Sequence, residues 1–313
     1  MITFFLLYLL VSRGLTKQIG HRWDGSPAFP YYSSADFGVK EERFSFFSGR
    51  WKLDGSRYFL PGGTFKALIV VFHGIGAGRN AYMKTICNFA KRGFLVYAFD
   101  YTGCMRSEGP LSYGLGHVYN DVKAFYEFLD QDEKASGLRR FSWGHSWGGY
   151  AALLSANPAY RVERIVSLAG VVDEGKEYGA LSKTLRSPFF QFLIRLRSKW
   201  FEKVPTNSCF EDLSQTKARI LYIQGLKDAM VPYENSGALL KERFGKSSHF
   251  SFLFLPERDH YLDSSQKASD YIKSLLKSGL GKLHADPSIT MDIKQATEAD
   301  EEIEKATFDF LSL

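Results

Sequence analysis

A serine between two glycines is the residue whose surroundings most clearly suggest chemistry. Ser146 lies in Gly144-His145-Ser146-Trp147-Gly148, which has the spacing G-x-S-x-G. The residues before it favour a short strand, and residues 149–156 after it are rich in helix formers. A chain that turns this sharply from strand to helix has no room for side chains at the two glycines, and it holds the serine hydroxyl clear of the sheet. The pattern predicts a nucleophilic serine at a strand-to-helix turn.

A serine hydroxyl becomes an effective nucleophile only when a base takes its proton and a third group orients that base. Where a serine occupies such a turn, the acid and then the histidine follow it along the chain, each after a strand. Asp228 follows one expected strand and His260 follows the next. His249 precedes the strand that His260 follows, so it would lie at the opposite end of the sheet. We therefore predict a triad of Ser146, Asp228 and His260.

Other acids and histidines lie near these positions in the sequence. Asp173 follows a strand expected before it and is the alternative acid. Asp259 and Asp263 flank His260 too closely to orient its ring easily. His145 lies inside the turn itself, and we interpret it as a packed or pocket residue and not as the base.

The negative charge that develops on an attacked carbonyl oxygen needs N–H donors that are already in place. One donor is the residue after the nucleophile, Trp147. The loop Phe72-His73-Gly74-Ile75-Gly76-Ala77-Gly78 follows an apolar strand, and its glycines let backbone amides approach a ligand closely. We assign the second donor to Ile75. A dinucleotide site in this loop is the alternative, but the spacing is not G-x-G-x-x-G and no acidic residue is placed to bind a ribose.

Strand and helix patterns alternate along most of the chain. The strand patterns cover residues 42–48, 51–60, 67–72, 94–99, 164–169, 220–223 and 250–255, besides the strand that leads into Ser146, and helix patterns cover residues 81–91, 117–129 and 265–280. The first two strands are expected to form a hairpin, and several later ones are continuous apolar runs, as in strands buried on both faces. The alternation predicts an α/β fold with a mostly parallel sheet, opened by antiparallel strands and covered by helices on both faces.

One interval between two strands holds no strand pattern of its own. Residues 172–215 contain the Phe-rich stretch at 189–194 and then Trp200-Phe201. We interpret this interval as a helical cap inserted late in the sheet, which would form and gate an apolar pocket over the nucleophile. A cap that only shields the edge of the sheet is the alternative.

The composition excludes several classes of function. A chain of 313 residues can bury a large core as one α/β unit. The net charge of +6 is scattered, and no Lys/Arg block is interleaved with aromatic residues, so nucleic acid is not an expected partner. The three cysteines are widely spaced with no C-x-x-C, which argues against disulfides and zinc and suits a reducing, cytoplasmic compartment. The serine chemistry needs no metal and no organic cofactor.

Residues 2–11 are almost all apolar. The run is too short to span a bilayer, which needs about 20 residues, and it lacks the features of a secretory signal. One interpretation is a helix packed on the domain. Another is peripheral contact with a membrane, which would make a cytoplasmic protein membrane-associated, and a third is the remnant of a longer export or anchor segment.

Three regions are expected. Residues 1–40 form an N-terminal apolar segment and lead-in, residues 41–285 form the α/β domain with its cap at about 172–215, and residues 286–313 form an acidic tail with a short helix. The pattern Thr297-x-x-Asp300 before Ile303 predicts the start of that helix.

Five motifs together resemble those of the α/β-hydrolase superfamily, in its lysophospholipase and monoacylglycerol-lipase-like branch, which includes serine aminopeptidase-type sequences. They are FHGIGAG at 72–78, FDYTGCMRSEG at 99–109, GHSWGG at 144–149, QGLKDAMVP at 224–232 and RDHY at 258–261, and the similarity covers roughly residues 40–280. The resemblance implies Ser146 as nucleophile, His260 as base and Asp228 as orienting acid, with the amides of Ile75 and Trp147 as the oxyanion hole. Cys104 and Met105 depart from the usual D-x-x-G-x-G-x-S after Asp100, so substrate entry can differ.

We therefore expect a serine hydrolase that cleaves carboxylic esters through an acyl-enzyme. The substrate would be an acylglycerol, a lysophospholipid or a small acyl ester, and the Phe-rich cap favours medium acyl chains. An aminopeptidase or thioesterase with the same triad is the alternative, for which Glu174 or Glu177 could supply an acidic group for a substrate amine. A non-catalytic binding protein of the same fold is a further alternative, against which the ordered Ser, Asp and His argue. The sequence leaves the oligomeric state open.

Overall fold

A mixed sheet organises the computed structural model, which describes residues 8–10, 13–14, 22–24, 32–75, 78–110, 114–181, 187–197, 199, 209–262 and 300–312. Its eight strands are β1 (Lys40–Ser48), β2 (Trp51–Phe59), β3 (Ala67–Phe72), β4 (Phe94–Phe99), β5 (Arg140–His145), β6 (Val162–Leu168), β7 (Arg219–Gly225) and β8 (Phe250–Leu255). Their order across the sheet is β1-β2-β4-β3-β5-β6-β7-β8. β1 and β2 form an antiparallel hairpin and β2 pairs antiparallel with β4, whereas every later pair is parallel. The expected mostly parallel sheet with an antiparallel start is confirmed.

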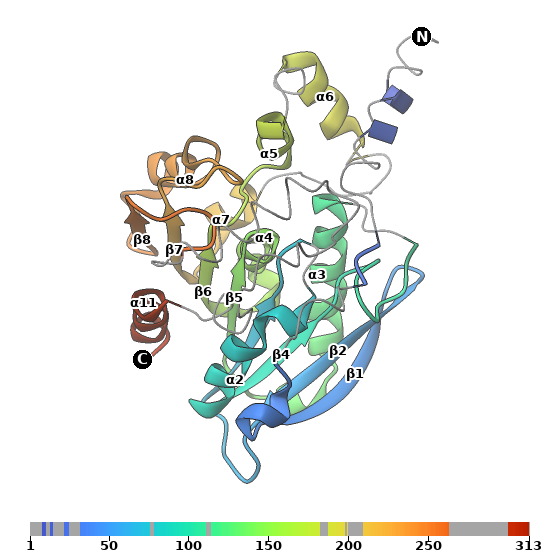
Figure 1. Ribbon diagram of the computed structural model, residues 1–313, viewed down its shortest axis with the longest axis vertical. Coiled ribbons are helices and arrows are strands. Elements are labelled where there is room, and N and C mark those ends of the chain that lie inside the picture. The colour runs from blue at the N-terminus through green and yellow to red at the C-terminus, as the bar shows by residue number, and fades with distance from the viewer. Residues whose placement is uncertain are drawn as a thin grey trace, which may run out of the picture.

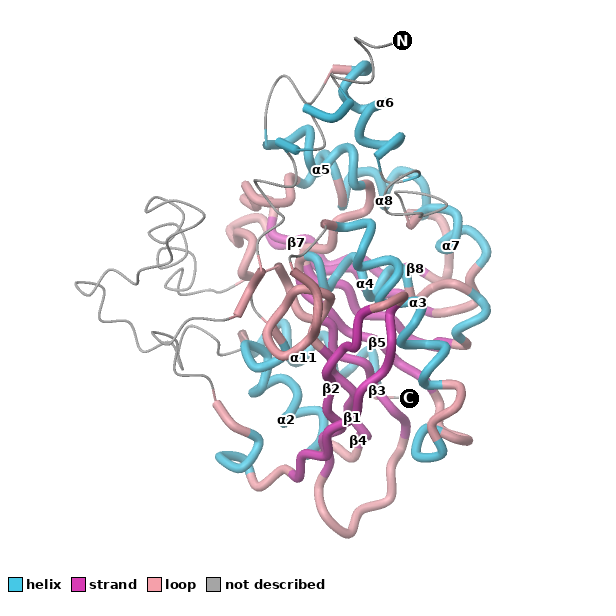
Figure 2. Tube along the Cα trace, turned by 90° about the vertical axis from the view of Figure 1, so that its right-hand side faces the viewer, coloured by secondary structure: helices cyan, strands magenta, loops and turns pink. Residues whose placement is uncertain are grey.

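Helices cover both faces of this sheet. The described α-helices, not all of which lie on these faces, are α2 (Met83–Lys91), α3 (Leu115–Leu129), α4 (Trp147–Leu154), α5 (Glu174–Leu181), α6 (Pro188–Arg197), α7 (Phe210–Gln215), α8 (Gly237–Phe244) and α11 (Glu301–Leu311). The core on one face contains side chains of α3, α4, α7 and α8, and the core on the other contains side chains of α2 and α11. Figure 2 shows the strands between α2 on one side and α3 and α7 on the other.

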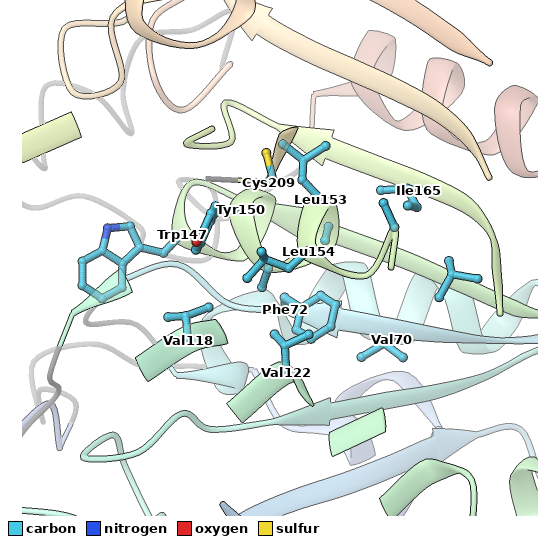
Figure 3. Close-up of a cluster of buried hydrophobic side chains, with 14 of the residues drawn as sticks. Val70, Phe72, Val118, Val122, Trp147, Tyr150, Leu153, Leu154, Ile165 and Cys209 are labelled. Atoms are coloured by element: carbon cyan, nitrogen blue, oxygen red, sulfur yellow. The ribbon is translucent and has the colours of Figure 1, made fainter. Parts of the chain in front are cut away.

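β3 illustrates why these residues form a central strand. All six of its residues are buried. Leu68, Val70 and Phe72 face the core that contains α3 and α4, while the residues between them face the other core. Figure 3 shows Val70 and Phe72 beside Val118, Val122 and Leu154. A strand buried on both faces needs a continuous apolar sequence, and this one supplies it.

The interval between β6 and β7 contains helices and, among its described residues, no strand. α5 and α6 lie beyond the end of the sheet, above α4 in Figure 1. α7 instead joins the core of the main domain, where Leu213 is buried. The expected helical insertion is confirmed in its described part, although its last helix belongs to the main domain. The limits of the three expected regions stay predictions.

Two details at the C-terminal side differ from the sequence interpretation or extend it. α8 lies between β7 and β8, where no helix was expected, and the helix expected at residues 265–280 lies outside the described residues. α11 is present, and the Asp300 side chain accepts from the Glu302 amide at 3.1 Å to cap it. One face of α11 is buried through Ile303, Thr307 and Leu311, so this helix covers the sheet and also presents a solvated face.

The N-terminal region is described only in short pieces. Residues 8–10 and 13–14 are helical, and no helix in the described part of the chain combines the length and apolarity needed to cross a membrane. Further on, residues 22–24 lie against the loop that follows β4. The Trp23 amide donates to the Gly103 carbonyl at 2.9 Å, and the Met105 amide donates to the Trp23 carbonyl at 2.6 Å. This short bridge ties the lead-in segment to a loop of the α/β domain.

Candidate active site

Ser146 lies at the turn between β5 and α4, in a strained backbone conformation. Its φ is 60° and its ψ is −120°, a combination that costs a residue with a side chain about 1–3 kcal/mol. The two flanking glycines make room for the turn. A Cβ on Gly144 would lie 2.0 Å from the Gly148 carbonyl oxygen, and a Cβ on Gly148 would lie 2.1 Å from the Phe72 carbonyl oxygen. Ser146 makes no side-chain capping bond to α4, so its hydroxyl is left to other partners.

Asp228 and His260 are joined by a buried hydrogen bond. The Asp228 carboxylate follows β7, and its Oδ2 lies 2.8 Å from His260 Nδ1 in the loop after β8. Its other oxygen, Oδ1, accepts from the amides of Met230 at 2.9 Å and Val231 at 2.8 Å. An ionised carboxylate only accepts, so Nδ1 carries a proton and the lone pair of a neutral imidazole lies on Nε2. This is the tautomer that a general base for a serine hydroxyl requires.

The structure brings His260 to the turn that carries Ser146. The His260 ring centroid lies 4.9 Å from that of His145, the residue before the serine. Ser146, Asp228 and His260 are all buried, at 5%, 5% and 3% exposure. Within the described part of the chain, no hydrogen bond joins the Ser146 hydroxyl to His260. Catalytic hydrogen bonds are often long in the unliganded state of an enzyme and shorten when substrate binds.

The loop after β3 runs beside Ser146. A Cβ on Gly74 would lie 3.6 Å from the Ser146 Cβ, and Ile75, the next residue, is half-buried. Trp147 is the first residue of α4, so its amide has no acceptor within the helix. Among the described residues, no group accepts a hydrogen bond from the Ile75 amide or from the Trp147 amide. Gly76 and Ala77 of the loop lie outside the described residues.

Two buried side chains hold this loop at its ends. At the start, His73 Nδ1 donates to the Gly74 carbonyl at 2.7 Å and Nε2 accepts from the Tyr101 amide at 3.2 Å. Burial lowers the pKa of His73 to about 4, so the ring is neutral at pH 7. At the end, the Arg79 guanidinium forms ion pairs with Asp100 and, at 2.7 Å, with Asp54. The sequence interpretation singled out neither residue.

Asp100 belongs to the segment that departs from the usual family pattern. Burial raises the pKa of Asp100 to about 6, against the opposing effect of Arg79. In the same segment, Met105 has φ 48°, in the region that favours glycine, and it lies where D-x-x-G-x-G-x-S has its second glycine. A Cβ on Gly78 would lie 2.4 Å from Met105 Cγ. The changed residue therefore packs directly on the loop that contains Ile75.

The alternative acids and bases occupy other roles. Asp173 Oδ1 accepts from the Lys176 amide at 2.9 Å and caps α5. Asp259 accepts from the Tyr261 amide at 3.1 Å in a local turn. His249 is exposed and precedes β8, at the opposite end of the strand from His260. Asp263 lies outside the described residues.

His145 is the residue whose role the sequence interpretation left least specified. Its Nδ1 lies 3.1 Å from the Tyr82 hydroxyl, and its Nε2 lies 2.8 Å from the His260 carbonyl oxygen. Tyr82 was not singled out at all, because nothing in its local sequence marks a tyrosine before a helix as a site residue. No group of three or more His, Cys, Asp or Glu in the described part of the chain is arranged to hold a metal ion.

This strand order, with a serine at the turn after β5 and an acid and a histidine after β7 and β8, defines an α/β-hydrolase fold. The chain belongs to the family described as serine aminopeptidase, S33, whose model matches residues 63–220, half of the chain. The matched residues include Ser146 and end before Asp228 and His260.

Curated relatives match between about a third and just over half of the chain. The human monoglyceride lipase is 36% identical over 118 residues, which is 37% of each chain. The caffeoylshikimate esterase of Arabidopsis thaliana is 28% identical over 135 residues, 42% of this chain and 40% of that protein. The monoglyceride lipase of Saccharomyces cerevisiae is 24% identical over 180 residues, 56% of each. The chain thus spans between about a third and just over half of the length of these relatives.

Solved structures share the fold at low sequence identity. An esterase from Pyrococcus furiosus superposes with a TM-score of 0.58 at 17% identity, covering 79% of this chain and 94% of that one. An acylaminoacyl peptidase from Pyrococcus horikoshii gives 0.54 at 15%, covering 83% of this chain and 44% of that one. At such identities the likeness supports the fold alone.

Proposed function

We propose that this protein is a serine hydrolase that cleaves carboxylic esters through an acyl-enzyme. Ser146 is the nucleophile, His260 the general base and Asp228 the acid that orients it. The amides of Ile75 and Trp147 form the oxyanion hole. The observation that carries the proposal is the buried hydrogen bond of 2.8 Å between His260 Nδ1 and Asp228 Oδ2, at the edge of the sheet where Ser146 lies.

The reaction follows from the assigned protons. As Ser146 Oγ attacks the ester carbonyl, His260 Nε2 takes the hydroxyl proton and Asp228 stabilises the resulting imidazolium. The carbonyl oxygen becomes negative and accepts from the two amides, each worth about 3 kcal/mol of barrier. His260 then returns the proton to the leaving alcohol, which leaves an acyl-enzyme. Water, activated by the same histidine, releases the carboxylic acid and restores the serine.

The relatives support an ester bond as the target. Two of the named proteins are monoglyceride lipases and one is a caffeoylshikimate esterase. An acylglycerol, a lysophospholipid or a small acyl ester would suit such a site, with medium acyl chains favoured by the cap. Phe189 and Phe192 of α6 lie in the cap, at 44% and 52% exposure.

The nucleophile can be tested directly. A fluorophosphonate probe should label the purified wild-type protein and should not label Ser146→Ala. Hydrolysis of p-nitrophenyl esters should fall by several orders of magnitude in the same variant, as it does when a triad serine is removed. Equal labelling of both proteins would end the assignment of Ser146 as the nucleophile, and a wild-type protein that neither is labelled nor hydrolyses esters would be a non-catalytic protein of this fold.

An aminopeptidase is the second candidate, because the matched family carries that description. Such an enzyme needs an acidic group for the substrate amine, and Glu177 of α5 is a candidate on which the charge of Asp228 acts. Burial, followed by the charge of Asp228, raises the pKa of Glu177 to about 8. A carboxyl that is mostly protonated at pH 7 attracts an ammonium weakly, which favours the ester substrate. Turnover of aminoacyl nitroanilides, acyl thioesters and acyl esters by the same preparation separates the three activities.

We also propose that the protein is cytoplasmic and contacts membranes peripherally through residues 2–11. Of this run the structure describes residues 8–10, in which Leu9 and Leu10 are 39% and 66% exposed. Exposed leucines of this kind partition into a lipid interface more readily than polar residues do. Flotation with anionic vesicles should recover the full chain and should recover less of a variant that lacks residues 1–12. Equal recovery would assign these residues to the protein surface alone.

A further inference from the structure

Three hydrogen bonds run in series between the loops that surround Ser146. The Gly74 amide donates to the Tyr82 hydroxyl oxygen at 3.1 Å. The Tyr82 hydroxyl lies 3.1 Å from His145 Nδ1, and His145 Nε2 lies 2.8 Å from the His260 carbonyl oxygen. The series therefore starts in the loop after β3, passes through the residue before the nucleophile and ends on the backbone of the proposed base.

Only one neutral arrangement of protons satisfies all three bonds. The His260 carbonyl can only accept, so His145 Nε2 must carry a proton. A neutral imidazole then has its lone pair on Nδ1, which accepts from the Tyr82 hydroxyl. The tyrosine oxygen keeps its lone pairs for the Gly74 amide. Each donor in the series thus faces an acceptor, and the tautomer of His145 is fixed by its two neighbours.

The surroundings of His145 keep it in this neutral form. Burial, followed by the charge of His260, lowers the pKa of His145 to about 4. Its ring lies 4.9 Å from the ring of His260, 5.9 Å from that of Tyr261 and 6.3 Å from that of Tyr82. Tyr82 in turn packs edge-on against Trp143 of β5, at 5.8 Å between ring centroids. Neither partner of the histidine is therefore a freely rotating surface group.

We propose that His145 and Tyr82 are positioning residues. They keep the backbone of the proposed catalytic histidine, His260, and the loop after β3 that contains Ile75 in fixed positions around Ser146. The inference rests on the proposed function, because it assigns to the two residues a place in that reaction. His145 bonds the Tyr82 hydroxyl and the His260 carbonyl oxygen, and neither of these atoms takes part in the proposed reaction. It acts through His260, whose ring must meet the serine hydroxyl, and Tyr82 acts through Gly74, which precedes the amide of Ile75.

A histidine that only fills space would respond differently to substitution. Asparagine places its amide near the position of Nδ1, so His145→Asn can still meet Tyr82 but cannot reach the His260 carbonyl. Glutamine places its amide near the position of Nε2, so His145→Gln can still donate to that carbonyl. A packing role predicts equal losses from the two amides, or a greater loss from the longer one. The proposed role predicts that glutamine restores activity that asparagine loses.

The experiment measures kcat and KM for p-nitrophenyl butyrate in His145→Asn, His145→Gln and Tyr82→Phe, with melting temperatures for each. His249→Asn is the matched control, since this exposed histidine lies at the far end of β8. His145→Asn should lower kcat by about 10²-fold, the effect of a misplacement near 1 Å, with KM changed less than about threefold. His145→Gln should recover at least about tenfold of that loss. Tyr82→Phe, which removes one oxygen and leaves the ring packed, should lower kcat about tenfold.

Tyr82→Phe keeps the proposal open to refutation if an amide variant fails to fold. The proposal would be overturned if Tyr82→Phe had the wild-type kcat and His145→Asn either also had the wild-type kcat or failed to fold. Equal kcat values for His145→Asn and His145→Gln would overturn it as well. Ser146→Ala separates this failure from that of the proposed function. If Ser146→Ala is inactive while Tyr82→Phe and both amide variants have wild-type kcat, only the positioning role is wrong. If Ser146→Ala keeps wild-type activity, the proposed function itself is wrong.

Discussion

Replacement of Asp228 by asparagine tests the proton arrangement of the site with almost no change in shape. The carboxylate accepts at both oxygens, from His260 Nδ1 on one side and from the amides of Met230 and Val231 on the other. An asparagine has one oxygen and one NH₂ group. If its oxygen keeps the two backbone amides, its NH₂ group faces His260 Nδ1. The ring must then carry its proton on Nε2 and cannot take one from Ser146.

The opposite orientation of the asparagine is disfavoured by the same contacts. It would turn the NH₂ group toward the two backbone N–H groups and leave both without acceptors. A buried unsatisfied donor costs about 1–3 kcal/mol, so the two together cost about 4 kcal/mol, or a population near 10⁻³. We therefore expect Asp228→Asn to lower kcat by between about 10³- and 10⁴-fold, the upper value being typical of an orienting carboxylate replaced by its amide.

The assay is kcat and KM for an ester substrate, with the free energy of unfolding from urea denaturation. Asp259→Asn is the matched control, because Asp259 adjoins His260 and accepts from the Tyr261 amide at 3.1 Å in a local turn. It should keep kcat within about threefold of wild type. Both variants should unfold within about 1–2 kcal/mol of wild type, since the backbone contacts persist. An Asp228→Asn protein with kcat within tenfold of wild type would refute the assignment of this acid and of the tautomer.

Three further variants test the packing and charge of the site. Gly148→Ala should reduce the free energy of unfolding, measured by urea denaturation, by at least about 3 kcal/mol, because its Cβ would lie 2.1 Å from the Phe72 carbonyl oxygen. A smaller loss would mean that the backbone at the turn between β5 and α4 can move away from Phe72. Arg79→Met should lower the free energy of unfolding by about 3–5 kcal/mol, since Asp100 and Asp54 each lose a buried ion pair. Arg139→Met, in a half-exposed ion pair, should cost less than about 1 kcal/mol, and equal losses would contradict the buried network. Folding lowers the pKa of His73 from 6.5 to about 4. Between about pH 4 and pH 6.5 the unfolded chain therefore binds a proton at this residue that the folded chain does not bind. The free energy of unfolding should rise with pH across this range and fall as the pH is lowered. His73→Gln should reduce that slope, measured between pH 5 and 6, by about 1.4 kcal/mol per pH unit, and an unchanged slope would show that the ring titrates normally.

The strands were the part of the fold that the sequence predicted best, for a physical reason. β3 and β4 begin and end where continuous apolar runs begin and end, because all six residues of each strand are buried and both faces of such a strand need apolar side chains. α8 was missed because it has only eight residues, and the glycine that opens it looks like a helix breaker. In the structure a Cβ on that residue, Gly237, would lie 2.4 Å from Gln224 Oε1, so a larger residue would displace a buried amide that is held by hydrogen bonds to Val231 and Gly237.

The site was predictable to the extent that its residues follow strands. In a parallel sheet every strand ends at the same edge, so an ordered Ser, Asp and His must gather there. Their catalytic roles stay predictions. The sequence could not predict which side chains support them, because such contacts depend on how loops far apart in the chain meet. His145 is 63 residues from Tyr82 and 115 residues from His260, and no local pattern links the three.

The supporting contacts explain why the loop after β3 can be rich in glycine and still hold an amide in place. Glycine lets a backbone approach a ligand but also gives it freedom, and an oxyanion hole is useful only when its donors are fixed before the reaction. Here the rigidity comes from hydrogen bonds at the two ends and on one side of the loop. His73 fixes its start and Arg79 fixes its end, each through a buried hydrogen bond, and Tyr82 holds the Gly74 amide from the side through a partly buried one. Because Tyr82 also contacts His145, the proposed role predicts that a shift of His260, the proposed base, also shifts the loop after β3, and the tyrosine and histidine variants measure this coupling.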